Sequence, residues 1–386
     1  MKLDNIYDFT IIGAGAAGLH LALSMLKDDW FVEKKILILE KDTKNNDDKT
    51  FCFWEQGKGA WDELITCSWK KGKFITDKKN IDLHLFPYQY KMIRAGDFYK
   101  MARHKIAEYS NISWVRDEVV DLKPGSPATI QGLSNTYLSR QVFDSRVEIN
   151  NKIKEEKYVH LKQHFKGWEI KTDEPVFDDS TFTMMDYRLK WENSTSFTYV
   201  LPTSPTTALV EFTFFTSFTI DYDDYDDYLR KYIKDLLNID RYSINKIEYG
   251  IIPMSSFPFH KAGSEGIMKI GTAGSWVKPS SGYSFKNAEK NARKLIENIK
   301  QQKKLSKGLL NSRFQFYDAV YLAVLKEQNH LGETIFTDMY GKNPIQQIFK
   351  FLDEETSLWE EIKIIASFKS LPFLKGLWNY MSRLGF

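Results

Sequence analysis

Two stretches decide the fold of this chain: Ile11-Ile12-Gly13-Ala14-Gly15-Ala16-Ala17-Gly18-Leu19 and Lys35-Ile36-Leu37-Ile38-Leu39-Glu40. The first is an apolar run that ends in the pattern G-x-G-x-x-G, and residues compatible with a helix follow it to about Lys27. The second is an apolar run that ends in an acid. A strand, a glycine turn, a helix and a second strand in this order predict a βαβ unit that binds a dinucleotide.

Each glycine of the pattern has a physical reason to be there. Gly13 permits the tight turn after the strand, Gly15 lets the backbone approach a pyrophosphate, and Gly18 lets the helix pack closely on the sheet. The pyrophosphate is expected at the helix start, where unpaired N–H groups and the helix dipole favour negative charge. Glu40 is placed to accept hydrogen bonds from a ribose diol. An ordinary glycine turn is the alternative, because such patterns also arise in loops.

The place of the motif in the chain indicates which dinucleotide is bound. G-x-G-x-x-G lies near the N-terminus and does not recur, which is typical of one tightly held FAD. A flavoprotein also needs a late segment that closes over the flavin. Ile270-Gly271-Thr272-Ala273-Gly274 and Pro279-Ser280-Ser281-Gly282 predict that segment, so we expect cofactor contacts at Gly271, Gly274, Pro279 and Gly282. A glycine-rich β-to-α turn without a ligand is the alternative.

The size and composition of the chain fit an enzyme with a hydrophobic substrate. Its 386 residues are enough for a nucleotide domain and a substrate domain. Aromatic residues make up 15% of the chain, including 27 Phe and 20 Tyr. These large, rigid rings suit a hydrophobic binding site as well as a core.

Other classes of partner are disfavoured by charge and cysteine content. The formal net charge of +3 gives no field that argues for nucleic acid. Cys52 and Cys67 are the two cysteines, and no Cys or His spacing is typical of a metal site. We expect a cytoplasmic protein, because no signal peptide is evident and no apolar run approaches the roughly 18 residues of a spanning helix.

The pattern along the chain predicts an α/β protein with a discontinuous nucleotide domain. Residues 1–160 and 262–300 are assigned to the Rossmann-type FAD-binding domain, 161–261 to a substrate domain, and 301–386 to a helical C-terminal region. The substrate domain is predicted to hold an antiparallel sheet, because β-rich segments there alternate with turn residues. Four such segments are recognised: 168–171, 181–189, 195–201 and 208–215.

Two charged segments carry their own predictions. Asp221 to Asp227 is most simply the solvated start of a helix that runs to Leu237, and a cation site there is the less favoured reading. The last twenty residues are aromatic and basic, with Lys369, Lys375 and Arg383 and no acid. They predict peripheral docking on the inner face of a membrane, with a helix packed on its own domain as the alternative.

Seven motifs, in order, resemble those of the lycopene cyclase family, the flavoproteins that close the ends of linear carotenoids into rings. The resemblance runs from the first strand to about Tyr283 and weakens after it. The motifs are Asp48-Lys49-Thr50-Phe51-Cys52-Phe53-Trp54, Tyr90-Lys91-Met92-Ile93-Arg94, Met185-Asp186-Tyr187-Arg188, Phe197-Thr198-Tyr199-Val200-Leu201-Pro202, Val210-Glu211-Phe212-Thr213, Gly250-Ile251-Ile252-Pro253-Met254 and Gly271-Thr272-Ala273-Gly274 through Lys278-Pro279-Ser280-Ser281-Gly282-Tyr283.

The resemblance implies a fold like that of the aromatic-hydroxylase flavoproteins. It also implies lycopene or a related C40 carotenoid as substrate, reduced FAD without net redox change, and NAD(P)H as the reductant. Arg94, at the end of the second motif, is implied to bind the cofactor. The chain departs from many relatives at Phe51, where they have Trp, and at Phe212, where they have a second acid or an amide.

Glu211 is the predicted proton donor. Protonation of a terminal alkene gives a tertiary carbocation, the neighbouring double bond closes the ring, and loss of a ring proton gives the β end. A carboxyl that stays protonated near neutral pH can begin this sequence, and burial in an apolar site raises a carboxyl pKa. Glu211 lies inside the apolar run Ala208 to Phe215, and the resemblance places the essential acid here. Without the resemblance, Glu211 would be interpreted as an outward-facing residue of an alternating strand.

Two further acidic segments are predicted with less support. Asp186 falls in the family's second acidic motif, so it is predicted to orient Glu211 or a water, and a buried turn acid is the alternative. The segment Phe351-Leu352-Asp353-Glu354-Glu355-Thr356-Ser357-Leu358 echoes the catalytic motif of plant cyclases. Because its surroundings are charged and helical, we interpret it as a solvated helix face.

Two other functions stay open at this point. The same fold can host a flavin monooxygenase or reductase that acts on an isoprenoid or aromatic substrate. A carotenoid-binding protein without catalysis is a third hypothesis, which nothing in the sequence favours.

Overall fold

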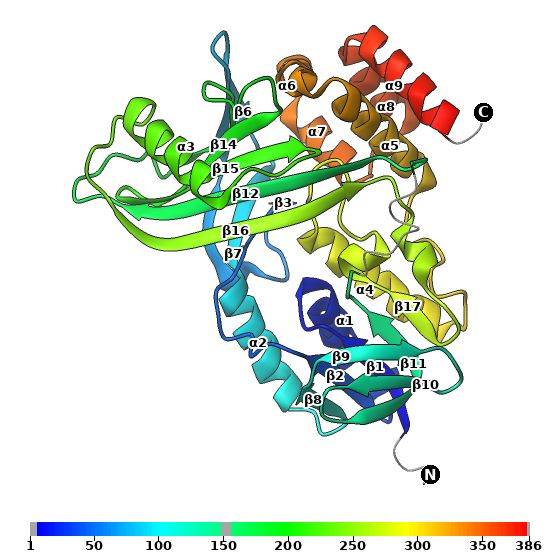
Figure 1. Cartoon of the computed structure of the whole chain (residues 1–386). Helices are drawn as coiled ribbons and strands as arrows, with labels where there is room; N and C mark the ends of the chain where they lie inside the picture. The colour runs from blue at the N-terminus through cyan, green and yellow to red at the C-terminus, as the bar shows by residue number, and fades with distance from the viewer. Residues whose placement is uncertain (1–5, 148–155, 384–386) are drawn as a thin grey trace.

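The computed structural model describes residues 6–147 and 156–383, and within them it confirms the mixed α/β architecture. Figure 1 shows one sheet with its helices at one end of the molecule and the long strands of a second sheet at the other end. The C-terminal helices pack beside the long strands. The strands form two seven-stranded sheets and a smaller one. The small sheet, in the order β3-β7-β4, consists of β3 (Thr50–Gln56), β7 (Tyr88–Arg94) and β4 (Ile65–Trp69).

The first large sheet is the Rossmann-type unit. Its order is β8-β2-β1-β11-β10-β9, and β17 pairs with β11. Strands β8, β2, β1 and β11 run parallel, as the βαβ pattern predicts. The strands are β1 (Ile6–Ile12), β2 (Ile36–Glu40), β8 (Ile112–Arg116), β9 (Val119–Lys123), β10 (Ala128–Gly132), β11 (Thr136–Asp144) and β17 (Ile267–Lys269).

Three helices complete the nucleotide layer. They are α1 (Ala16–Leu26), α2 (Ala95–Ala107) and α4 (Phe285–Lys300). α1 packs against both α4 and α2, and their apolar side chains form one continuous core with β1 and β2. The close fit of α4 on α1 brings residues from the late segment to the start of the first helix.

The second large sheet has the order β16-β12-β15-β14-β13-β5-β6. All neighbours are antiparallel except β13 and β5, which run parallel. Residues 71–84 therefore supply two strands to this sheet, although the sequence division placed them with the nucleotide domain. The strands are β5 (Lys71–Ile75), β6 (Asn80–His84), β12 (His160–Lys171), β13 (Thr181–Asp186), β14 (Ser196–Ser204), β15 (Thr207–Thr216) and β16 (Ser243–Ser255).

Both faces of the second sheet are covered, and they differ. One face packs on α3 (Tyr222–Asp235), which lies over the long strands in Figure 1. On β15 this face carries Val210, Phe212 and Phe214. The other face turns to the small sheet and the C-terminal helices, and there β15 carries Leu209 and Phe215. We call these the α3 face and the inner face.

The C-terminal region is helical, as predicted. It contains α5 (Ser312–Glu327), α6 (Gly332–Lys342), α7 (Ile345–Leu352), α8 (Leu358–Ser367) and α9 (Ser370–Arg383). α9 packs closely on α5: a Cβ at Gly376 would stand 2.5 Å from Val324 Cγ2. No helix within the described ranges is long and apolar enough to cross a membrane.

Candidate active site

Glu211 faces the inner side of the second sheet, near the middle of β15. It stands opposite Tyr199 on β14 and Gly167 on β12, and its side chain is half-buried. Thr213 donates a hydrogen bond from Oγ1 to Glu211 Oε1 at 2.8 Å. Burial, with the charge of Glu248 as a second cause, raises the pKa of Glu211 to about 8 against the opposing hydrogen bond. A carboxyl in this setting is protonated at neutral pH and can donate a proton.

Tyr199 and Cys52 lie close to this acid, at the edge of a larger aromatic cluster. The hydroxyls of Tyr90 and Tyr283 are hydrogen-bonded at 3.1 Å. Burial raises the pKa values of Tyr90, Tyr199 and Cys52 far above neutral, so these groups stay uncharged. The apolar side chains around Tyr90, Tyr199 and Cys52 form one cluster, which lies between the inner face, the small sheet and helices α5 to α7. Glu211 therefore lies beside a face that is rich in π systems, and the charge of Glu248 also acts on it.

Trp54 on β3 extends the aromatic wall towards α7. Its ring stacks on Phe349 with centroids 4.5 Å apart, and it meets Tyr283 edge-on at 4.6 Å. Its indole Nε1 donates to Asp353 Oδ2 at 2.6 Å. Burial raises the pKa of Asp353 to about 7 although this hydrogen bond opposes the shift.

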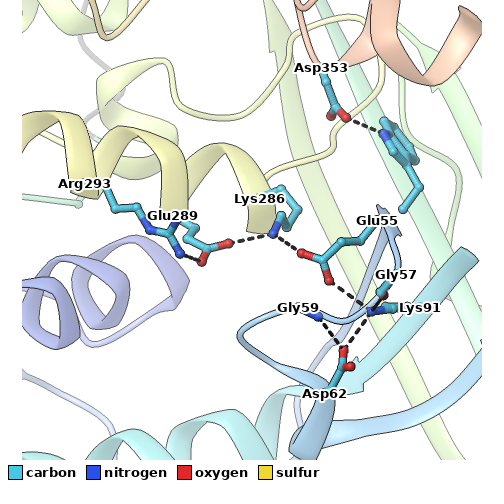
Figure 2. Close-up of polar contacts among 10 residues, drawn as sticks. Glu55, Gly57, Gly59, Asp62, Lys91, Lys286, Glu289, Arg293 and Asp353 are labelled. Atoms are coloured by element: carbon cyan, nitrogen blue, oxygen red, sulfur yellow. Dashed lines mark hydrogen bonds and ion pairs between the residues drawn. The ribbon is translucent and has the colours of Figure 1, made fainter. Parts of the chain in front are cut away.

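The interpretation of residues 351–358 as a solvated helix face is therefore wrong for part of the segment. Asp353 caps α7 and points to Trp54, as Figure 2 shows, and Glu354 pairs with the buried Lys278 at 3.2 Å. The charged residues suggested exposure, but the chain turns between α7 and α8 and directs both side chains inward. Glu355 alone of the three acids is exposed.

A network of ion pairs lies beside the Asp353 contact in Figure 2. Lys91 on β7 is buried between Glu55 at 3.0 Å and Asp62 at 2.7 Å. Glu55 also binds Lys286 at the start of α4, at 2.7 Å. Lys286 continues to Glu289 at 2.8 Å. The network connects the small sheet to α4. It therefore holds the small sheet, which packs on the inner face, against a helix of the Rossmann-type unit.

Asp186 is not brought to Glu211. It lies at the end of β13, fully buried, where Arg188 Nη2 and Tyr232 Oη donate to its Oδ2 at 2.6 and 2.8 Å. Tyr232 belongs to α3, so the carboxylate is on the α3 face. The predicted role in orienting Glu211 therefore has no geometric support, and the structural alternative is favoured.

The glycine turn after β1 has the geometry that a dinucleotide requires. Gly13 has φ of +94°, which favours glycine, and a Cβ at Gly18 would lie 2.0 Å from the Gly13 carbonyl oxygen. A Cβ at Gly15 would meet no described atom within 4 Å. Gly13 and Gly18 thus serve the turn and the packing, while the space in front of Gly15 at the start of α1 can admit a phosphate.

Glu40 lies where the sequence places it, at the end of β2 beside the turn. Its Oε2 accepts from the amide of Ala14 at 2.6 Å and its Oε1 accepts from Asp42 at 2.9 Å. Both oxygens thus hold the backbone next to the expected ribose, and their remaining lone pairs are free to accept from a diol.

The late glycine segment lies against α1. Gly271 has φ of +60°, and a Cβ there would stand 3.0 Å from Ala17 Cβ. Gly274 is equally tight, with 2.5 Å to the Lys269 carbonyl oxygen. The turn that contains Pro279 is closed by Gly282 N–H donating to the Lys278 carbonyl at 2.9 Å. The two glycine segments therefore meet at the start of α1.

Two buried polar atoms near the Gly282 turn lack a hydrogen-bond partner among the described residues. They are Ser281 Oγ and Gln163 Oε1. Gly282 has φ of +74°, and a Cβ there would approach Gln163 Oε1 to 2.0 Å. Orphaned polar atoms beside a crowded glycine are what a polar ring system bound at this turn would satisfy.

Arg94 does not point to free space. It precedes α2 and forms ion pairs with Asp47 at 3.2 Å and with Glu169 on β12. Asp47 also accepts from Lys246 on β16 at 2.6 Å. Arg94 thus ties the 41–49 loop to the second sheet, and a contact with the cofactor stays a prediction.

Glu248 is a site residue that the sequence analysis did not identify. It lies on β16 opposite Gly167, in the same row as Glu211, and accepts from Thr50 Oγ1 at 2.5 Å and Lys246 Nζ at 2.7 Å. The signal in the sequence was weak: an acid two residues before Gly250. Its importance depends on register between β12, β15 and β16, which no local pattern encodes.

The comparisons with known proteins agree with the motifs. The family model for lycopene cyclase protein matches residues 8–377. No curated protein matches the chain by sequence.

Solved structures show the same fold at low sequence identity. A geranylgeranyl bacteriochlorophyll reductase-like protein from Thermoplasma acidophilum has a TM-score of 0.61 and 14% identity, over 97% of this chain and 99% of that one. A flavin-dependent brominase gives 0.57 and 16%, over 98% and 100%. A probable FAD-dependent monooxygenase from Pseudomonas aeruginosa gives 0.52 and 9%, over 91% and 100%. The fold is thus that of Rossmann-type flavoproteins.

Proposed function

This chain belongs to the lycopene cyclase family, and we propose that it is a lycopene β-cyclase that isomerises lycopene to γ- and β-carotene. The observation that carries the proposal is Glu211, a half-buried carboxyl with its pKa raised to about 8 on an aromatic face of the sheet. The proposal makes the enzyme an intramolecular lyase, or isomerase, because substrate and product have the same atoms.

The residues account for each proton. Glu211 gives its proton to the terminal alkene carbon and becomes a carboxylate, and the neighbouring double bond attacks the resulting tertiary cation to close the ring. The ring then loses one proton from the carbon next to the cation. The Glu211 carboxylate can accept that proton and return to its starting form, so no proton or electron is gained or lost.

The aromatic groups protect and stabilise the cation. Tyr199 lies opposite the acid, and Trp54, Tyr90 and Tyr283 belong to the same aromatic cluster. Ring faces attract positive charge by about 0.5–2 kcal/mol each. Exclusion of water by the same rings prevents addition of hydroxide to the cation, which would give an alcohol in place of a ring.

FAD fits the glycine turn and is the proposed cofactor. The start of α1 at Gly15 would bind the pyrophosphate, in a turn that Gly13 and Gly18 make possible, and Glu40 would bind the ribose. The Gly271 and Gly282 turns would contact the flavin side of the molecule. When bound and reduced by NAD(P)H, the flavin would add negative charge that favours the cationic step without net redox change.

We also propose that the enzyme docks on the inner face of the membrane, where a C40 hydrocarbon dissolves. Helices α8 and α9 expose large apolar side chains: Leu358, Trp359, Ile362, Leu371, Leu374 and Trp378, of which Trp359 and Leu371 are each 76% exposed. Lys363, Lys369 and Lys375 lie among them and are suited to anionic lipid. α9 also packs on α5 at Gly376, as the alternative of a helix packed on its own domain expects, so the proposed docking would use the exposed side of the helix.

The proposal is tested by expressing the chain in bacteria that already make lycopene. Pigments are separated by chromatography against γ- and β-carotene standards and weighed by mass spectrometry. A ring-containing product of unchanged mass supports the cyclase. A product heavier by oxygen or by hydrogen would instead identify a monooxygenase or a reductase, and unchanged lycopene beside folded, FAD-loaded protein would refute the substrate.

A further inference from the structure

We infer that Glu248 is a positioning residue for the proton of Glu211: an ion-paired carboxylate in the same row of the sheet that keeps Glu211 in its donating form. The inference rests on the proposed function for its biological meaning. Its physical basis is the arrangement of Glu248, Gly167 and Glu211, which we call the acidic row.

The register of three strands forms the acidic row. Glu248 on β16 stands opposite Gly167 on β12, and Gly167 stands opposite Glu211 on β15. Directly opposed residues share one face of a sheet, so both carboxyl groups belong to the inner face. Two strand spacings place their Cα atoms roughly 10 Å apart, within mutual reach of two Glu side chains.

Gly167 lies between the two acids and has no side chain, so the space between them is open at this position. A Cβ at this position would lie 3.3 Å from Glu211 Cβ, 3.4 Å from its Cγ and 3.1 Å from Leu209 Cδ1. An alanine would therefore press on the Glu211 side chain. The glycine lets Glu211 lie low over β12, towards Glu248.

Glu248 is held by two hydrogen bonds, one of them part of an ion pair. Thr50 on β3 donates to its Oε1, and Lys246 donates to the same oxygen at 2.7 Å. Lys246 is shared with Asp47, which also binds Arg94, and Arg94 binds Glu169. Glu169 is thus paired with Arg94, whereas Glu248 shares Lys246 with Asp47.

The other groups that face Glu211 add no opposing charge. Cys52 on β3 and Tyr199 on β14 interact with it electrostatically, and burial raises the pKa of each so that both stay neutral. Thr213 on its own strand is neutral and donates a hydrogen bond. Glu248 therefore supplies the charge that disfavours ionisation of Glu211.

The test is a titration of Glu211 that does not depend on turnover. The carbonyl band of the protonated Glu211 side chain is isolated in infrared difference spectra of FAD-loaded wild type minus E211Q, from pH 5 to pH 10. Glu248→Gln should move its midpoint down by about one pH unit, because a neutral amide no longer repels the ionised form. If E211Q does not fold, ¹³C-labelled glutamate spectra of wild type and E248Q give the same comparison.

The matched control is Glu169→Gln, which removes a carboxylate from the same face and strand as Gly167 but one row away, beside Leu209. It should leave the Glu211 midpoint within a few tenths of a pH unit. Lys246→Met removes the positive charge that is paired with Glu248. The negative charge of Glu248 is then less neutralised, so the Glu211 midpoint should move upward. A purely structural role for Glu248 gives no shifts of opposite sign.

The outcomes separate this inference from the proposed function. A midpoint in E248Q that equals wild type, or a shift of equal size in E169Q, overturns the inference whatever the enzyme does to lycopene. A downward shift in E248Q with no cyclisation by wild type supports the inference and overturns the function. With cyclisation present, the alkaline limb of the rate profile should follow the infrared midpoint in both variants.

Discussion

The two faces of the second sheet hold two buried acids with opposite surroundings. On the α3 face, Asp186 receives hydrogen bonds from Arg188 and Tyr232. On the inner face, Glu211 receives one from Thr213 and shares its row with another carboxylate. Pairing with a cation favours the ionised, structural form of an acid, whereas burial and a like charge favour the protonated form that a proton donor needs. The difference lies in the partners and not in the residue type.

The sharpest test of this contrast is Glu211→Gln. Because the amide cannot donate an acidic proton, ring formation should fall by about 10²- to 10⁴-fold. FAD content and melting temperature should stay close to wild type, since Gln keeps the shape and Thr213 can still donate. The measurement is initial rate of β-carotene formation at pH 7 with purified, reduced enzyme. Near-normal turnover would remove Glu211 from the role of acid.

Asp186→Asn probes the other face and should act on stability. The change replaces a fully buried carboxylate, which is paired with Arg188, by a neutral amide. Because Arg188 is one-third exposed, we expect a loss of about 2 kcal/mol in the free energy of unfolding. Urea denaturation measures it. Turnover per folded, FAD-loaded molecule should stay within about threefold of wild type. A large loss of turnover at unchanged stability would break the contrast between the two faces.

Gly167→Ala should disturb the inner face more mildly. The new methyl group would press on Glu211 Cβ and Cγ, so turnover is expected to fall about tenfold by misplacement of the donor. Gly341→Ala in α6 is the control, because its Cβ would meet Ile81 Cδ1 at an ordinary 3.5 Å. Equal rates for the two variants would show that the position of Glu211 tolerates a shift.

The smallest expected effect is a gain in stability of E211Q at alkaline pH. The folded pKa of Glu211, about 8, lies above its unfolded value of 4.5, so its contribution to stability is full below pH 4.5 and is lost as pH rises through 8. Gln has no such loss. E211Q should therefore be more stable relative to wild type at pH 9 than at pH 5, and the difference should grow as pH rises between the two. Thermal denaturation at both pH values checks this, and a constant difference would contradict it.

Local patterns predicted those parts of the fold and site that depend on near neighbours in sequence. The turn at Gly13 to Gly18 follows from steric demands within a few residues, and it is present with the expected geometry. The antiparallel strands β12, β14 and β15 follow from alternation and turn residues. Glu211 stands out as an acid in an apolar strand, but the strand pattern alone favoured an outward-facing residue, and the family resemblance was needed to predict it as the proton donor.

The remaining features of the site depend on the register between strands that are distant in sequence and on contacts between distant segments of the chain. Glu248 meets Glu211 through β12, and Asp353 meets Trp54 from the other end of the chain. The face taken by Asp186 was not predictable from its motif, because one residue of register decides between the α3 face and the inner face. Nothing in the local sequence identifies β13 as the partner of β5.

The insertion of β5 and β6 into the second sheet limits how far the two halves of the molecule are independent modules. A fragment that begins at residue 161 would lose both strands and present β13 as a bare edge, which is a template for aggregation. The same crossing of the chain means that an evolutionary exchange of the substrate region between relatives has to carry residues 71–84 with it. Recombination points that respect this fold therefore lie on both sides of the β5–β6 hairpin as well as at the ends of the later sheet.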